Sequence, residues 1–437
     1  MKLNRVQLPR FIANKTTDEN YELSRRRFII EGCLSNSIFV LTSGAFFAGY
    51  AEYLGANSKF NGMIAALPSL AAAVQLLSPV VFEKLTSRKK LISLLCLLYR
   101  SILACMIFIP LITQNTQVRL LLLGSMYFLA YLLSGFLSPG GSSWIISLVP
   151  ERMRGRYFGL RDTCILATAA VMSLLMGRVL DIFKYSGNKY GGFFVVYMVV
   201  AVLVIGNFLT LRRIREPSIT PSRIKINLKD VFKLPLLDKK FRKIVLLFVT
   251  WNLCVQVGLP FFSVYLVTGL KLSYTYIMAI SIVVSVMSAV SAKIWGRIAE
   301  RFSWQFTTAL SIGMLGFCHI MWMMVDKNSY IFLLPFTQVL GGISWAGINM
   351  SLFNIQFLYA PQEGRTVFIG FNAAVAGIVG FISAMVGATL VGKLENISIS
   401  LGFVNVGNMQ FIFGLSGILL IICSISFRFL FARINKA

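Results

Sequence analysis

The sequence predicts an all-α integral membrane protein with twelve transmembrane helices in two six-helix bundles. Three observations support this fold class. The chain is 57% hydrophobic and only 13% charged, whereas soluble domains carry about a quarter charged residues. Apolar runs that could cross a bilayer core of about 30 Å recur along the whole chain. A long polar and basic segment divides these runs into two equal sets.

The first set of apolar runs predicts six helices. Each run is about 20 residues or longer, the length needed to span the hydrocarbon core. The first run is too long for the apolar part of a signal peptide, so we expect it to remain as a membrane helix. The six runs are Phe28–Leu54, Phe60–Phe82, Leu91–Ile112, Leu120–Leu148, Tyr157–Ile182 and Gly192–Leu211.

The second set follows the polar segment and predicts six more helices, at Ile244–Thr268, Tyr274–Ile298, Gln305–Val325, Tyr330–Leu358, Val367–Val391 and Met409–Phe431. We therefore expect an N-terminal tail (1–27), a first bundle (28–213), a linker (214–243) and a second bundle with a short tail (244–437). In the linker, "SRIKINLKDVFKL" could form an amphipathic helix at the membrane surface. A solvated linker held near anionic lipid is an equally good interpretation.

The basic residues predict the orientation of the chain. Clusters such as "RRR" at 25–27, "RKK" at 88–90 and "ERMRGR" at 151–156 fall on the same side as the linker. By the positive-inside rule, this side is cytoplasmic. We expect a multi-pass plasma membrane protein with both termini in the cytoplasm. Although the net charge is +26, confinement of the basic residues to these loops argues against nucleic-acid binding.

Signatures of catalysis are missing from the sequence. His319 is the one histidine, so no zinc-protease motif can form, and no nucleotide-binding GxxxxGK[ST] motif occurs. All seven cysteines lie inside apolar runs without a CxxC pair, as expected for small apolar residues. We expect no enzymatic activity, no catalytic residue, no cofactor and no metal centre.

Loops in the two halves repeat each other. The loop after the second run reads "PVVFEKLTSRKK" from Pro79, and its counterpart after the eighth reads "GRIAERFSWQ" from Gly296. The loop "PERMRGRYFG" from Pro150 likewise matches "PQEGRTVFIG" from Pro361. Parallel repeats of this kind are one way in which transporters are built.

With these repeated loops and its six-six division, the chain resembles the major facilitator superfamily over essentially its whole length. The resemblance implies a transporter that works by alternating access. It also implies that the charged loop residues make contacts between helices on the cytoplasmic side, which favour an outward-open state. These gating residues are Glu83, Lys84, Arg88, Arg154, Glu300, Arg301 and Arg365. Alternatively, these charges serve only as orientation signals.

In the family, spans 1, 4, 7 and 10 line the central cavity. In span 10, the spacing of Gln338, Trp345, Asn349 and Gln356 places all four within about 20° of one line on the helix. Such side chains suit a neutral or weakly charged organic solute, such as a sugar, drug or metabolite; hydrogen bonding between helices is the alternative. The other candidates are Trp251, Asn252, Gln256, Tyr127, Tyr131, Ser35 and Thr42.

The energy source is predicted from the acidic residues. Because no ATP site is visible, we expect proton coupling through Glu31 or Asp162, the two acids well inside a span on the inner side. Both also lie near basic clusters and within early helical turns, where a negative charge is favourable in any case. Facilitated diffusion therefore stays open.

Arg100 lies within an otherwise uncharged run, nine residues from its inner end, or about 14 Å at 1.5 Å per residue. At this depth the guanidinium must face protein. We expect a structural role, with hydrogen bonds to carbonyls and polar side chains of spans 2 or 4, because no acid of the first bundle lies at the same depth. The alternative is that Arg100 binds an anionic substrate group.

Taken together, the sequence predicts a monomeric secondary active transporter for a small organic solute. Its expected partners are the solute, a proton and membrane lipid. One alternative is a lipid or glycolipid flippase, whose cavity would open sideways to the bilayer. Another is a membrane receptor or scaffold without transport activity. In such a protein we would expect bulky apolar side chains in place of the polar stripe of span 10.

Overall fold

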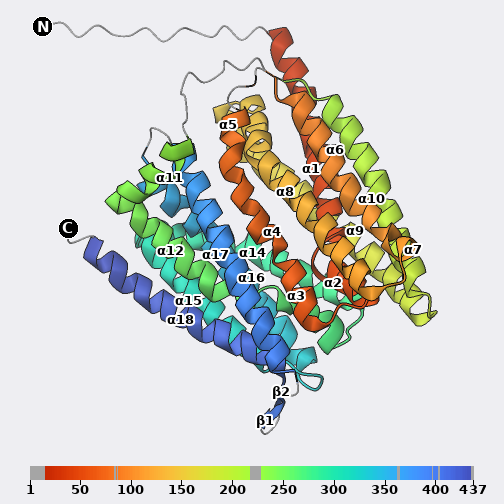
Figure 1. Cartoon of the computed structure of the whole chain (residues 1–437). Coiled ribbons are helices and arrows are strands. Elements are labelled where there is room, and N and C mark those ends of the chain that lie inside the picture. Colours follow the sequence, from red (N-terminus) through yellow and green to blue (C-terminus); the bar gives the residue numbers. More distant parts are fainter. Residues whose placement is uncertain are drawn as a thin grey trace, which may run out of the picture.

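The computed structural model describes residues 15–434, except 83, 84, 86, 217–227, 362–364, 396, 402 and 403. In this part of the chain, twelve helices are long and apolar enough to cross a membrane. They form two bundles that lie side by side (Figure 1). The predicted fold class is therefore confirmed. The exact domain boundaries stay a prediction.

The first bundle contains spans 1 to 6. Short interruptions divide the first three spans into several helical segments. The elements are α1 (Lys15–Leu41), α2 (Gly44–Tyr53), α3 (Ser58–Ala65), α4 (Leu67–Ala71), the 3₁₀ turn η1 (Ala72–Leu77), α5 (Ser78–Phe82), α6 (Lys89–Cys105), η2 (Met106–Phe108), α7 (Ile109–Ile112), α8 (Thr116–Leu148), η3 (Glu151–Met153), α9 (Arg154–Tyr185) and α10 (Lys189–Arg212).

The second bundle contains spans 7 to 12 and a short antiparallel hairpin that the sequence did not predict. The elements are α11 (Leu228–Leu237), α12 (Lys239–Gln256), α13 (Phe261–Val264), the π-helical turn η4 (Tyr265–Gly269), α14 (Tyr274–Arg301), α15 (Trp304–Met323), α16 (Tyr330–Tyr359), α17 (Arg365–Lys393), β1 (Ile399–Leu401), β2 (Val404–Val406) and α18 (Asn408–Ile434).

The connection between the bundles includes a helix. This helix, α11, covers the second part of the predicted amphipathic segment, whereas residues 217–227 lie outside the described part. It contacts α12 and α17, and the ring of Phe232 meets that of Phe371 at 6.2 Å between centroids. The linker therefore packs against the second bundle.

The first span is broken between α1 and α2. Thr42 donates a hydrogen bond to the carbonyl of Ile38 at 2.8 Å, and Gly44 has a φ of +55°. Only glycine adopts this left-handed conformation readily. The break therefore depends on the glycine at this position.

Equivalent contacts occur in the two bundles. The hydroxyl of Tyr50, in the first span, donates to the carbonyl of Met106, in the third, at 2.7 Å. In the second bundle, the hydroxyl of Tyr265 donates to the carbonyl of Val325 at 2.7 Å; these residues lie in the first span and just after the third. The sequence repeat is therefore accompanied by a repeat in tertiary contacts.

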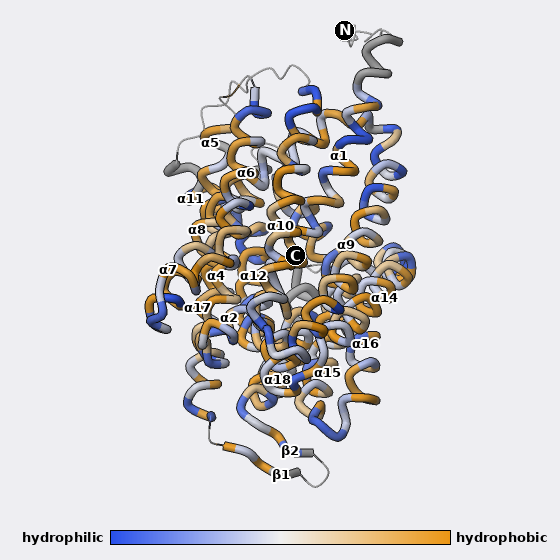
Figure 2. The backbone as a smooth tube through the Cα atoms, turned by 90° about the vertical axis from the view of Figure 1, so that its right-hand side faces the viewer, coloured by the Kyte–Doolittle hydropathy of each residue, from blue (hydrophilic) through white to orange (hydrophobic). Residues whose placement is uncertain are grey.

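We call the end of the molecule at which α1 begins and α18 ends the termini side, and the end with β1 and β2 the hairpin side. Figure 2 shows mainly hydrophobic helices between more hydrophilic ends. Such a distribution is expected when the middle of each helix faces hydrocarbon and the ends face water.

The bundles contact each other through three sets of helices: α9 with α14, α17 with α3, α4 and η1, and α2 with α13 and η4. In Figure 1 the bundles converge toward the hairpin side. Glycines permit the close approach. A Cβ atom at Gly377 of α17 would collide with the carbonyl oxygen of Ser69, and one at Gly177 of α9 would lie 3.2 Å from the backbone of Tyr274.

Candidate functional site

A network of charged and polar side chains lies inside the first bundle, centred on Arg100 of α6. Only 3% of Arg100 is exposed. Its guanidinium donates hydrogen bonds to the hydroxyls of Tyr99 (2.8 Å) and Ser35 (2.6 Å), and to the side-chain oxygen of Asn207 on α10. Its Nη2 also lies 3.5 Å from Oε1 of Glu31. These four partners surround the charge that the sequence places in the middle of the membrane.

The partners of Arg100 correct the sequence-based expectation. Apart from its neighbour Tyr99, they come from spans 1 and 6, not from spans 2 or 4, and they include an acid. The helix that carries Glu31 begins upstream of the predicted Phe28, since α1 starts at Lys15. Glu31 therefore lies well inside this helix rather than in its first turns, and its side chain reaches the level of Arg100.

Glu31 is itself buried and receives several donors. Asn207 donates to its Oε1 at 3.3 Å and to its backbone carbonyl at 3.2 Å. A second guanidinium, that of Arg161 on α9, lies 4.0 Å from Oε2. Because removal of one partner leaves an uncompensated buried charge, the members of such a network depend strongly on one another.

Arg161 and Asp162 form the more accessible part of the network. Their side chains are 22% and 65% exposed, and Arg161 Nη1 lies 3.6 Å from Asp162 Oδ1. The buried Nε of Arg161 has no hydrogen-bond partner within the described part of the chain. Arg161 is therefore less fully occupied by protein partners than Arg100.

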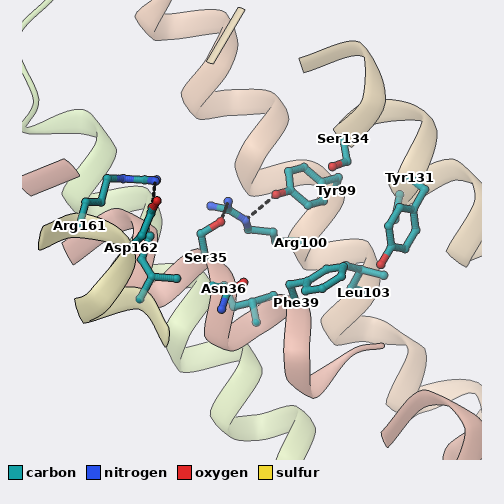
Figure 3. Close-up of a pocket in the computed structure, with 14 residues that line it drawn as sticks. Ser35, Asn36, Phe39, Tyr99, Arg100, Leu103, Tyr131, Ser134, Arg161 and Asp162 are labelled. Atoms are coloured by element: carbon teal, nitrogen blue, oxygen red, sulfur yellow. Dashed lines mark hydrogen bonds and ion pairs between the residues drawn. The ribbon is translucent and has the colours of Figure 1, made fainter. Parts of the chain in front are cut away.

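A cavity of about 430 Å³ opens against this network. Figure 3 shows side chains of α1, α6, α8 and α9 around it, with Arg161 and Asp162 on one side and Tyr131 on the other. Hydroxyl and amide groups from Ser35, Asn36 and Ser134 also line it. We call it the charged cavity. A neighbouring cavity of about 540 Å³ shares Arg100, Arg161 and Ser134 and adds Glu31 to its lining.

A third cavity, of about 530 Å³, lies between the bundles. Leu166 and Ala170 of α9 face Ile277, Met278 and Ile282 of α14 across it, with α1 and the start of α2 along its edge. Its lining is largely apolar, apart from hydroxyls and the amide of Asn36. We call it the apolar cavity. Because Asn36 also lines the charged cavity, the two are neighbours.

The candidate residues of spans 7 and 10 lie elsewhere, in the second bundle. The rings of Trp251 and Trp345 meet edge to face at 5.9 Å. Asn252 donates to a carbonyl of its own helix. Gln338 is half-buried and Asn349 is exposed. These residues line neither the charged nor the apolar cavity, and their contact with a solute stays a prediction.

Two glutamines from this group bond to neighbouring helices. Gln256 donates to the hydroxyl of Ser69 in the first bundle at 3.4 Å. Gln356 accepts a hydrogen bond from Asn372 of α17 at 3.5 Å. Both contacts are of the kind expected if polar side chains join helices.

The remaining candidates lie in the first bundle, where the structure separates them. Ser35 and Tyr131 line the charged cavity. Tyr127 is buried and stacks on Phe47 with the ring centroids 4.0 Å apart. Thr42 is fully buried at the break in the first span. Packing therefore accounts for the positions of Tyr127 and Thr42.

The predicted gating residues are only partly described. Glu83 and Lys84 lie outside the described residues, as does the side chain of Arg365. Arg88 is buried and donates to the carbonyl of Phe82 (2.9 Å) and the hydroxyl of Ser143 (2.7 Å). These contacts fix a loop within the first bundle.

The other predicted gating side chains have local surroundings. Arg154 donates to the carbonyl of Val149 at 3.3 Å. Glu300 and Arg301 are exposed at the end of α14, and the guanidinium of Arg301 lies 5.5 Å from the ring centroid of Phe302. Their gating role stays a prediction.

On the hairpin side, a buried acid joins the two bundles. Asp181 of α9 accepts hydrogen bonds from the backbone N–H groups of Tyr274 and Thr275, both at 2.8 Å, and from the Thr275 hydroxyl at 2.6 Å. These residues form the first turn of α14. A carboxylate is favourable there because the first N–H groups of a helix lack partners within the helix.

Sequence reasoning missed three residues of these sites. Arg161 lies inside the fifth predicted span. It is so close in sequence to the basic cluster at 151–156 that it looks like part of the loop rather than a charged residue of the span. Asn207 was visible as a polar residue in the apolar sixth span. Asp181 lies at the end of the fifth predicted span, and no sequence signal connects it with α14.

Comparisons with known proteins identify the family and the fold of this chain. The family model described as Major Facilitator Superfamily matches residues 32–384. No curated protein matches the sequence. Among solved structures, a variant of the nucleoside transporter NupG has a TM-score of 0.68 at 12% identity, covering 95% of this chain and 99% of that one.

Two further structures have similar folds. A bacterial homologue of the iron transporter ferroportin, in an inward-facing state, has a TM-score of 0.68 at 16% identity. A bacterial metal transporter has a TM-score of 0.59 at 13% identity. Each comparison covers 92% of this chain and 97% of the other. At these identities the similarity establishes the fold alone.

Proposed function

This chain belongs to the major facilitator superfamily and is a secondary transporter, and we propose that it moves a small organic solute by alternating access, coupled to protons at Glu31. The observation that carries this proposal is the charged cavity beside the buried network of Glu31, Arg100 and Arg161. Its volume of about 430 Å³ is within the usual range of small-molecule sites.

The geometry of Glu31 supports its coupling role. One carboxylate oxygen lies 3.5 Å from Arg100, and the other lies 4.0 Å from Arg161. A proton on Glu31 would remove the negative charge that these guanidiniums share. Arg161, at the edge of the cavity, would then be free to bind a group of the solute. Protonation and solute binding are therefore linked through Arg161.

Asp162 is the weaker candidate for proton coupling. Its side chain is 65% exposed, whereas Glu31 is buried between two guanidiniums. It does, however, share Arg161 with Glu31. We propose that it helps to hold Arg161 at the cavity when no solute is bound.

The arrangement of the bundles supports access from the termini side. Asp181 joins the bundles on the hairpin side, and the apolar cavity separates α9 from α14 along the stretch nearer the termini side. We propose that the termini side is cytoplasmic, as the basic loops predict. The described arrangement is then open to the cytoplasm.

Proton coupling can be tested in proteoliposomes that enclose a pH-sensitive dye. Sugars, nucleosides, peptides and organic acids are screened for solute-evoked proton movement. Glu31→Gln should abolish gradient-driven accumulation of a solute found in this way while exchange of that solute continues. Glu395→Gln, which changes an exposed carboxylate outside the membrane spans, is the matched control. Unchanged accumulation in Glu31→Gln would remove Glu31 from the mechanism.

The apolar cavity favours a second candidate, a lipid flippase. Its lining by Leu166, Ile277 and Ile282 suits hydrocarbon better than sugar. A flippase would move labelled phospholipid between the leaflets of the same proteoliposomes. If it did so without any response to water-soluble solutes, this second function would replace the first.

A further inference from the structure

The charged and apolar cavities are neighbours along two helices. Asn36 of α1 lines both. On α9, Asp162 and Ile165 line the charged cavity, whereas the adjacent Thr163 and Leu166 line the apolar one. Each cavity is large enough for part of a ligand, at about 430 and 530 Å³. One molecule can therefore reach both.

The charged cavity has one incompletely satisfied cation. Arg100 is surrounded by four protein partners. Arg161 has carboxylate oxygens only at 3.6 and 4.0 Å, and its buried Nε has no partner in the described part of the chain. A guanidinium offers five N–H donors and binds a carboxylate or related oxyanion through two of them. Arg161 lines the cavity without a close protein carboxylate, so its guanidinium is placed to bind an anionic oxygen of a ligand.

The apolar cavity has no ionisable side chain in its lining and contains small residues that leave space between the helices. On α9, Leu166 and Ala170 are one helical turn apart and face the same cavity. Burial of apolar ligand surface there would contribute roughly 25 cal/mol per Å². The part of a ligand that lies in this cavity is therefore apolar.

We propose that the transported solute is an amphipathic organic anion, whose anionic oxygens bind Arg161 in the charged cavity while its apolar body lies between α9 and α14. This inference rests on the proposed function and specifies its substrate class. A positively charged solute, held by the exposed Asp162, is the competing possibility. It would leave the unpartnered Nε of Arg161 without an acceptor.

Calorimetric titration of the full chain in lipid nanodiscs tests the proposal, with the heat from empty nanodiscs subtracted. The probe is 2-naphthalenesulfonate, which combines a permanent anion with an apolar body. Methanesulfonate lacks the apolar body, 2-naphthalenesulfonamide lacks the charge, and 2-naphthylmethylammonium reverses it. We expect saturable binding of 2-naphthalenesulfonate and at least about tenfold weaker binding of the other three. The neutral and cationic probes lose hydrogen bonds to a charged group, which costs about a factor of ten, and methanesulfonate loses the burial of the apolar body.

Variants of α9 locate the two parts of the site. Arg161→Gln should weaken 2-naphthalenesulfonate binding about tenfold, and Arg161→Lys should restore part of the loss because the charge remains. Ala170→Phe should also weaken binding by filling the apolar cavity. Arg178→Gln changes an exposed arginine of the same helix that lines neither cavity and should have no effect.

Three results would overturn the substrate class: no saturable binding of 2-naphthalenesulfonate, equal or tighter binding of the neutral or cationic probe, or unchanged binding in Arg161→Gln. If solute-evoked proton movement and its dependence on Glu31 persist in any of these cases, the proposed proton coupling stands and only the proposed substrate class, an amphipathic anion, is wrong. If 2-naphthalenesulfonate binds as expected but no solute moves protons, the site stands and the proposed coupling fails.

Discussion

At the scale of single residues, Glu31, Arg100 and Arg161 of the first bundle form one network. Arg100 lies 3.5 Å from Glu31, and Asn207 contacts both. Charges at this depth are costly unless they are paired or hydrogen-bonded. The pairing explains how the protein accommodates a permanently protonated side chain in the middle of an apolar helix.

This network changes the expected effect of replacing Arg100. From the sequence alone, Arg100→Leu should impair folding or transport only moderately, because its removal would leave no unpaired ion. Since Glu31 is that partner, we now predict a loss of about 3–5 kcal/mol in the free energy of unfolding. Arg100→Leu combined with Glu31→Leu should recover much of the loss. Denaturant unfolding of the two single variants and the double variant measures this coupling; additive effects would show that the residues act independently.

Asp326, in the loop between α15 and α16, is a buried acid whose charge contributes to the stability of the fold. Burial raises the pKa of this carboxyl, but hydrogen bonds from Ser329, Asn328 and Asn405 outweigh burial, so its pKa lies below the ordinary value. Its ionised form therefore stabilises the fold at neutral pH, and this contribution is lost as the pH falls through the lowered pKa.

Asp326→Asn should accordingly lower the unfolding temperature at pH 7 and have progressively less effect as the pH falls toward 3. Glu395→Gln, at an exposed carboxylate, is the control. Thermal unfolding over this pH range measures the difference. An effect of Asp326→Asn that does not change with pH would contradict the role of ionisation.

At the scale of helices, the contact between α9 and α14 holds the bundles together on the hairpin side. Asp181 accepts three hydrogen bonds from the first turn of α14. Asp181→Asn removes the charge, and we predict that it shifts the equilibrium away from the described arrangement by about tenfold. The hairpin-side ends of the bundles should then separate more often.

Distances between spin labels at Tyr185 and Lys327, two exposed residues near the hairpin side in different bundles, measure this shift. Asn188→Ala is the control because Asn188 caps α10 within the first bundle. It should reduce stability without changing the distances. Identical distance distributions in Asp181→Asn and the unmodified chain would contradict a closing role for Asp181.

The packing of α17 on α4 and η1 requires a glycine at Gly377. A methyl group at Gly377 would collide with the carbonyl of Ser69, whereas one at Gly370, on the same helix, has no atom within 4 Å. Gly377→Ala should lower the unfolding temperature. Gly370→Ala should be neutral or stabilising, by up to about 1 kcal/mol, because alanine favours helix. Equal effects of the two substitutions would rule out the close contact as their cause.

The helices themselves were predictable, whereas their interruptions and partners were not. Apart from the start of the first helix, each predicted span agrees with an observed span within a few residues, because length and apolar composition are local properties. The break at Thr42 and Ser43 and the hairpin at β1 and β2 depend on local turn geometry and tertiary contacts. The pairing of Glu31 with Arg100 required the true start of the first helix, which begins in a polar segment that hydropathy excluded.

At the scale of the whole molecule, the fold places the charged cavity in one bundle and the apolar cavity at the junction of both. Movement of the second bundle relative to the first would therefore change the apolar cavity more than the charged one. The polar stripe of span 10, strong as a sequence pattern, coincides with neither cavity. Amphipathic periodicity locates a face of a helix but not what lies opposite that face.

Alternating access requires that the charged cavity face the two sides of the membrane in turn. A cysteine at Ser134, which lines this cavity, reports from which side the cavity is reached, in a variant without the seven native cysteines. Sealed vesicles are treated with a membrane-impermeant thiol reagent from one side or the other. We predict labelling mainly from the termini side in the unmodified background, and increased labelling from the hairpin side when Asp181→Asn is added. Labelling from one side alone in both backgrounds would contradict alternating access at this cavity.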